Sequence, residues 1–143
     1  MKIINVYLDT SGSMDEMGKG SALLYIAKSI KDYCKFKSIE TCFYKLDKTK
    51  IVNMEGVKFS NDVKLSKDNF LSNSILLSDG LFEIEGKKIF DVAIAVGVDA
   101  DELNLNKFSS KLFTSDNVIK ALEYLLFNND LLGKSLNKDE DEW

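Results

Sequence analysis

The first apolar run of the chain ends directly on a polar motif, and this junction limits what the chain can fold into. The run, Ile3-Ile4-Asn5-Val6-Tyr7-Leu8, is too short for a helix and rich in β-branched residues, so it predicts a buried strand. The motif that follows is Asp9-Thr10-Ser11-Gly12-Ser13. Open α/β sheets bind ligands at the carboxyl ends of their strands, where this motif would lie. Its carboxylate and two hydroxyls are hard oxygen donors, which suit Mg²⁺ or Mn²⁺ and do not suit zinc.

The rest of the chain alternates between strand and helix patterns. Apolar residues at helical spacing predict a helix that starts at Ser21, the expected N-cap, or as early as Asp15, and a second helix that starts at Ser115. A turn at Asp47-Lys48 makes two strands, at 39–46 and 50–59, antiparallel neighbours. Residues 67–72 offer at most a short helix. The remaining expected elements are a strand that ends on Asp79, a hairpin over 81–90, a strand at 91–98, a helix at about 101–109 and a strand at 111–114.

This order of elements predicts an α/β fold. We expect a doubly wound, mostly parallel, Rossmann-like sheet with one antiparallel edge strand and helices on both faces. The length of 143 residues suits one domain with one core. That domain is expected over residues 1–128, followed by a polar, acidic tail over 129–143.

The composition excludes several classes of function. The net charge of -4 and the absence of arginine argue against a nucleic-acid surface, because bidentate phosphate and guanine recognition depends on arginine. The chain has no histidine, which removes Ser-His and Cys-His catalysis and histidine-ligated metals. The amino-terminal apolar run is too short for an export signal or a membrane span. Cys34 and Cys42 are therefore expected to be free thiols in a cytoplasmic protein that contacts no membrane.

At Asp9-Thr-Ser-Gly-Ser-Met14 the chain resembles the von Willebrand factor A (vWA) family, whose Asp-x-Ser-x-Ser pattern belongs to a metal-ion-dependent adhesion site (MIDAS). The stretch Ile75-Leu-Leu-Ser-Asp-Gly80 is similar to the fourth strand of that family and its metal-site aspartate. The stretch Val92 to Leu103, followed by Lys111-Leu-Phe-Thr and a closing helix, is similar to the last third of the family fold. The resemblance covers about residues 1–128, and its weakest part lies between 47 and 73.

The resemblance implies a magnesium site. Ser11 and Ser13 would bind Mg²⁺ (or Mn²⁺) directly, while Asp9 and Asp79 would act through waters or accept hydrogen bonds from ligated groups. A partner protein would supply an acidic residue that completes the coordination. Small standalone members of bacterial or phage type work in stress-response, tellurite-resistance and conflict systems, which is the setting that the resemblance implies.

The chain departs from the family pattern at one ligand. The family supplies a threonine from a glycine-rich loop, but this chain has no threonine between Thr49 and Thr114 and no Gly-Gly pair. The candidates for the replacement oxygen are Ser60, Asn61, Asp62 and Ser66.

Three other hypotheses remain beside the metal-dependent binding module. The Asp9 motif could be only a polar turn that caps the next helix, since such turns use the same residues. The chain could be a metal-free scaffold that keeps the fold. It could also be a metal-assisted hydrolase or phosphatase with Asp9 as nucleophile, although Ser11 stands where such enzymes place a second acid. Asp99 and Asp101 are expected to cap a helix and to interact with its dipole rather than to bind metal.

Overall fold

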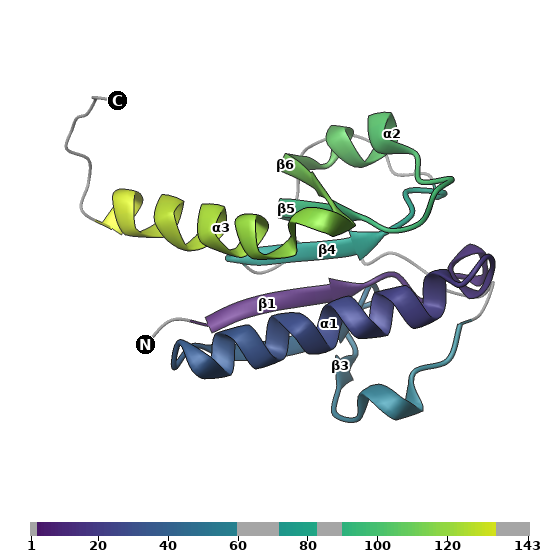
Figure 1. The fold of residues 1–143 in the computed structure, drawn as a ribbon, viewed down its shortest axis with the longest axis horizontal. Helices are drawn as coiled ribbons and strands as arrows, with labels where there is room; N and C mark the ends of the chain where they lie inside the picture. The colour runs from purple at the N-terminus through teal and green to yellow at the C-terminus, as the bar shows by residue number, and fades with distance from the viewer. Residues whose placement is uncertain (1–2, 60–71, 83–89, 134–143) are drawn as a thin grey trace.

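The protein, seen in a computed structural model, is described over residues 3–59, 72–82 and 90–133 (Figure 1). Along the chain the elements are β1 (Ile3–Leu8), α1 (Lys19–Phe36), β2 (Glu40–Lys45), β3 (Lys50–Ile51), β4 (Ser74–Ser78), β5 (Phe90–Ala95), α2 (Glu102–Lys107), β6 (Ser109–Thr114) and α3 (Val118–Gly133). Three short 3₁₀ turns accompany them: η1 (Gly12–Asp15), η2 (Met54–Gly56) and η3 (Ser115–Asn117).

The strands form one six-stranded sheet in the order β3-β2-β1-β4-β5-β6. β2 and β3 pair antiparallel at one edge, and the other neighbouring strands are parallel. The expected α/β fold with a mostly parallel sheet and one antiparallel edge strand is therefore confirmed. From β1 the chain continues to β2 on one side, whereas from β4 it continues to β5 and β6 on the other. The two central strands thus flank the point where the winding direction reverses, which is where such sheets hold ligands.

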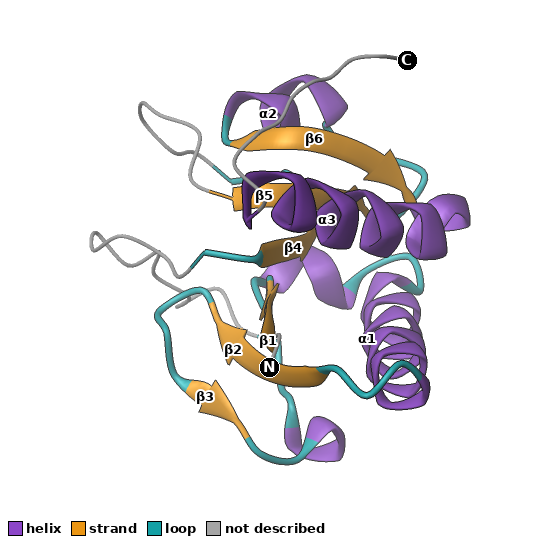
Figure 2. Ribbon diagram, turned by 90° about the vertical axis from the view of Figure 1, so that its left-hand side faces the viewer, coloured by secondary structure: helices purple, strands orange, loops and turns teal. Residues whose placement is uncertain are grey.

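Helices cover both faces of this sheet, as the alternation of elements predicted. Successive strand residues point to opposite faces, so Leu76 faces one side while Ile75 and Leu77 face the other. The helices α1 and α3 pack with the face of Ile75 and Leu77, and they lie next to each other (Figure 2). The short helix α2 supplies Leu105 to the opposite face, and β6 lies between α2 and α3. Burial on both faces explains why the central strands are continuous apolar runs.

Several expected boundaries differ from the observed ones. The helix α1 starts at Lys19, between the two expected starts, Asp15 and Ser21, but its N-cap is Gly18, which adopts a left-handed conformation with φ 74°, rather than Ser21. The strand expected over 50–59 shrinks to β3, since Asn53 accepts the Glu55 N–H and turns the chain into η2. The last helix continues past residue 128 to Gly133. The expected short helix at 67–72 and most of the hairpin over 81–90 lie outside the described residues.

Cys34 is buried, Cys42 is half-buried, and both are free thiols. Within residues 3–59, 72–82 and 90–133, none of the helices combines the length and the apolar content that crossing a membrane requires.

Leu77 tests the packing of α1 and α3 against the sheet. Its side chain is fully buried in the β4 segment, so Leu77→Ala is expected to lower the free energy of unfolding by about 2–5 kcal/mol through lost contacts and a residual cavity. Leu103→Ala on α2 is the matched control, because that leucine is 81% exposed, and its effect should stay within about 0.5 kcal/mol. Urea denaturation followed by circular dichroism measures both; equal losses would contradict the packing described here.

Candidate functional site

The four residues predicted for a metal site come together at one edge of the sheet. Asp9 follows β1 and Asp79 follows β4, and the arrowheads of these two neighbouring parallel strands point to the same edge (Figure 1). The Asp9 N–H donates to the Leu77 carbonyl at 3.0 Å, so the pairing of the two strands extends to the motif itself. Ser11 and Ser13 follow at the start of η1, with their hydroxyl oxygens 3.3 Å apart.

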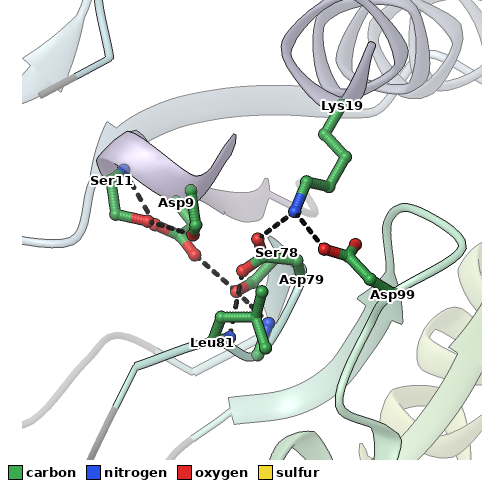
Figure 3. Close-up of polar contacts among 9 residues, drawn as sticks. Asp9, Ser11, Lys19, Ser78, Asp79, Leu81 and Asp99 are labelled. Atoms are coloured by element: carbon green, nitrogen blue, oxygen red, sulfur yellow. Dashed lines mark hydrogen bonds and ion pairs between the residues drawn. The ribbon is translucent and has the colours of Figure 1, made fainter. Parts of the chain in front are cut away.

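Asp9 is a buried carboxylate whose two oxygens are both hydrogen-bonded. Its Oδ1 accepts the Ser11 N–H at 2.9 Å, and its Oδ2 accepts the Ser78 hydroxyl at 2.6 Å (Figure 3). Burial raises the pKa of Asp9, and the hydrogen bonds from Ser78 and Ser11 counteract part of that effect. The charge of Asp79 raises the Asp9 pKa further, which indicates that the two carboxylates interact electrically. Asp9 therefore joins the end of β1 to the end of β4.

Asp79 is also fully buried, and both of its carboxylate oxygens accept hydrogen bonds. Its Oδ1 accepts the Leu81 N–H at 3.0 Å, while its Oδ2 accepts a hydrogen bond from the ammonium of Lys19 at 2.8 Å (Figure 3). The side chains of both members of this ion pair are 0% exposed. A buried carboxylate without such a partner would carry a large desolvation cost, and the ion pair with Lys19 offsets that cost.

Lys19, like Ser78, is a site residue that was not predicted from the sequence. It begins α1, and its ammonium also contacts Asp99 Oδ2 at 2.9 Å, on the loop after β5. A signal for it existed in the sequence: Lys19 lies on the same helical stripe as Leu23, Ile26 and Ile30, all of which are buried. A lysine on an apolar stripe indicates a buried cation that needs carboxylate partners.

The loop that carries Asp99 passes close to the side chain of Lys19 at Gly97. Gly97 has φ 99°, and a Cβ at this position would lie 2.5 Å from Cδ of Lys19, so only glycine lets the lysine stem pass. Asp99 was expected to cap a helix, and that expectation is wrong because its carboxylate holds Lys19 instead. Asp101 does cap α2, since its Oδ1 accepts the Asn104 N–H at 3.0 Å.

Positive and negative charges at this edge stabilise each other. Burial by itself would lower the pKa of Lys19, but Asp79 and Asp99 more than offset this, and the pKa lies above the ordinary value of 10.5. The lysine is therefore charged throughout the neutral range.

The direct ligands that this site offers a cation are serine hydroxyl oxygens. Among the described residues, no group of three or more His, Cys, Asp or Glu side chains is placed to hold a metal ion. A cation at this edge would therefore depend on the Ser11 and Ser13 hydroxyls for direct contacts. The four candidates for the missing threonine oxygen, residues 60, 61, 62 and 66, lie outside the described residues.

Comparison with known proteins adds no assignment. No protein-family model matches the sequence, and no curated protein matches it.

Lys19→Met is expected to destabilise the protein by about 3–5 kcal/mol at neutral pH, because it leaves the buried Asp79 carboxylate unpaired. The folded-state pKa of Lys19 is raised, so the contribution of the pair is complete below pH 10.5 and is lost as the pH rises above it. The difference in unfolding free energy between parent and variant should then be constant from pH 6 to about 10 and shrink at higher pH. Urea titrations at several pH values measure it; a difference that stays the same above that range would contradict the ion-pair account.

Gly97→Ala is expected to cost about 1–3 kcal/mol, since alanine resists the positive φ and its Cβ displaces the stem of Lys19. Gly56→Ala is the control: Gly56 is exposed with open space around its Cβ position, so the change should stay within about 1 kcal/mol. Thermal unfolding compares the two variants. Equal stability of both would show that the loop does not depend on a close approach to Lys19.

Proposed function

We propose that this protein is a metal-dependent protein-interaction module of the vWA type. Asp9, Ser11, Ser13 and Asp79 would form its Mg²⁺ (or Mn²⁺) site, and a partner protein would dock there through an acidic residue. The observation that carries this proposal is the meeting of the Asp-x-Ser-x-Ser motif with Asp79 at the ends of β1 and β4, where the winding of the sheet reverses.

The donor set fits such an ion. Two ligands on adjacent corners of a magnesium octahedron, with bonds of about 2.1 Å, lie roughly 3 Å apart. The hydroxyl oxygens of Ser11 and Ser13 are separated by 3.3 Å, which is close to that spacing. Asp9 and Asp79 already use their oxygens inside the protein, so they suit an indirect role in which they accept hydrogen bonds from water bound near the hydroxyls.

The same donor set favours an acidic partner. Neutral hydroxyls leave most of the positive charge of a bound cation uncompensated, and the cation would then supply an electrophilic centre for an incoming carboxylate. The buried carboxylates Asp9 and Asp79 supply negative charge behind the hydroxyls without blocking them. The net charge of -4 fits a protein partner better than a nucleic acid.

A binding role fits the geometry better than the hydrolase hypothesis does. An aspartyl nucleophile needs a free oxygen that can reach its substrate, whereas Asp9 is fully buried and both of its oxygens accept hydrogen bonds. The sequence also lacks histidine as a general base and arginine for stabilising transition-state charge.

One observation favours the metal-free scaffold as the second candidate. The ammonium of Lys19 already lies 2.8 Å from Asp79 and supplies a positive charge at the carboxylate side of the site. In that case the edge would be a structural ion-pair cluster. The proposed setting, a bacterial stress-response or conflict system in the cytoplasm, rests on the resemblance to the vWA family.

The test is a titration of chelator-treated protein with Mg²⁺ and Mn²⁺, followed by melting temperature and calorimetry. A ligand that binds the native state stabilises it by mass action, by about 2.7 kcal/mol at a hundredfold excess over Kd. We expect a saturable rise in melting temperature in the parent and its loss in Asp9→Ala and Ser13→Ala. Ser29→Ala is a control, because Ser29 lies on α1 and its hydroxyl donates to the Tyr25 carbonyl of the same helix.

If neither cation changes the melting temperature of the parent protein, the metal-free scaffold is favoured. Equal stabilisation of the parent, Asp9→Ala and Ser13→Ala would instead place any metal binding elsewhere in the molecule.

A further inference from the structure

We infer that the ammonium of Lys19 competes with the divalent cation for Asp79, so that Lys19 sets how tightly the site holds metal. This inference rests on the proposed metal site and adds a residue that the Asp-x-Ser-x-Ser pattern does not contain. It also links the two candidate functions, because the same side chain that stabilises this edge through Asp79 would weaken its affinity for metal.

The first observation is the position of Asp79 between Lys19 and the motif residues that would bind the cation. In Figure 3, Asp9 and Ser11 lie on one side of Ser78 and Asp79, and Lys19 reaches Asp79 from the other side. Asp79 carries one negative charge, and its Oδ2 is already 2.8 Å from the ammonium. A carboxylate that is neutralised by a lysine contributes little to a second cation nearby.

The second observation is that the lysine is built into the edge. Its stem passes over Gly97 with no room for a side chain there, and its ammonium holds Asp79 and Asp99 together. A lysine is almost never fully buried unless it is paired, so the burial of Lys19 depends on Asp79 and Asp99.

The third observation is that the ammonium has a second partner to keep if Asp79 Oδ2 turns from the lysine to a metal-bound water. The Asp79 side chain is 0% exposed, whereas the Asp99 side chain is 33% exposed. Release from Asp79 would leave the ammonium bonded to Asp99, on the side nearer to solvent. Asp79 can therefore accept a hydrogen bond from metal-bound water in place of the lysine without leaving the ammonium as a bare buried charge.

Repulsion between the two cations sets the size of the effect. In general, a lysine charge near a divalent cation weakens binding of that cation, by well over a factor of ten at a separation of roughly 6 Å and an effective dielectric constant of about 20. Removing that charge and freeing Asp79 should thus tighten metal binding by at least about tenfold.

The experiment is calorimetric titration of Mg²⁺ and Mn²⁺ into four chelator-treated proteins: the parent, Lys19→Met, Lys28→Met and the pair Asp79→Asn with Lys19→Met. Lys28→Met is the matched control, because Lys28 lies exposed on the same helix and the variant carries the same change in net charge. We expect at least about tenfold tighter binding in Lys19→Met and a change below about twofold in Lys28→Met. The gain should vanish in the double variant, where no carboxylate remains at position 79.

The outcomes separate the inference from the proposed function. Equal affinities in the parent and Lys19→Met would overturn the inference and leave the metal site standing. Binding by Lys19→Met but not by the parent would support the competition and contradict a metal-dependent role for the parent. An absence of binding in every variant would overturn both proposals.

A second measurement on the parent covers the case in which Lys19→Met does not fold. Proton–nitrogen NMR detects the side-chain ammonium of a buried, hydrogen-bonded lysine, and the Lys19 signal can be correlated with its backbone. We expect this signal to shift during a Mg²⁺ titration in step with the heat of binding. Metal binding that leaves the Lys19 signal unchanged would overturn the inference.

Discussion

The buried ion pair between Lys19 and Asp79 is the interaction on which the carboxyl edge of the sheet depends. It joins the start of α1 to the end of β4, and Asp99 extends it to the loop after β5. Two buried carboxylates, Asp9 and Asp79, follow the central strands, and their repulsion would favour separation of those strands. The lysine charge, the Ser78 hydroxyl and backbone donors balance that repulsion. Protein groups alone thus supply the contacts that hold this edge together.

The sequence predicted the fold because the forces that set it are local and periodic. Apolar runs of strand length, separated by helical patterns, lead to a parallel α/β sheet, and the turn at Asp47-Lys48 leads to an antiparallel edge. The errors have physical causes. Val52 is 93% exposed and Asn53 turns the chain, so β3 ends early although apolar residues continue beyond it. The start of α1 depends on the left-handed Gly18, which periodicity does not reveal.

The sequence predicted the two aspartates of the candidate site but not the residues that hold them. Asp9 and Asp79 could be paired because both end apolar strands, and the ends of parallel strands share one edge. Ser78 carried no comparable signal, and the place of Lys19 on the apolar stripe of α1 indicated burial without showing its partners. A single lysine near a helix start is most often solvated, and its burial depends on Gly97 and Asp99, which lie far along the chain. Long-range partnerships of this kind follow from the assembled sheet rather than from local pattern.

The most direct measurement of the central claim is a crystal structure of the protein with Mn²⁺, located by its anomalous scattering. The account predicts a peak within metal–oxygen bonding distance of the Ser11 and Ser13 hydroxyls. It also predicts that the Lys19 ammonium leaves Asp79 and remains on Asp99. An edge without a peak at saturating Mn²⁺, with Lys19 still bonded to Asp79 as it is here, would contradict the account and identify the edge as a structural ion-pair cluster.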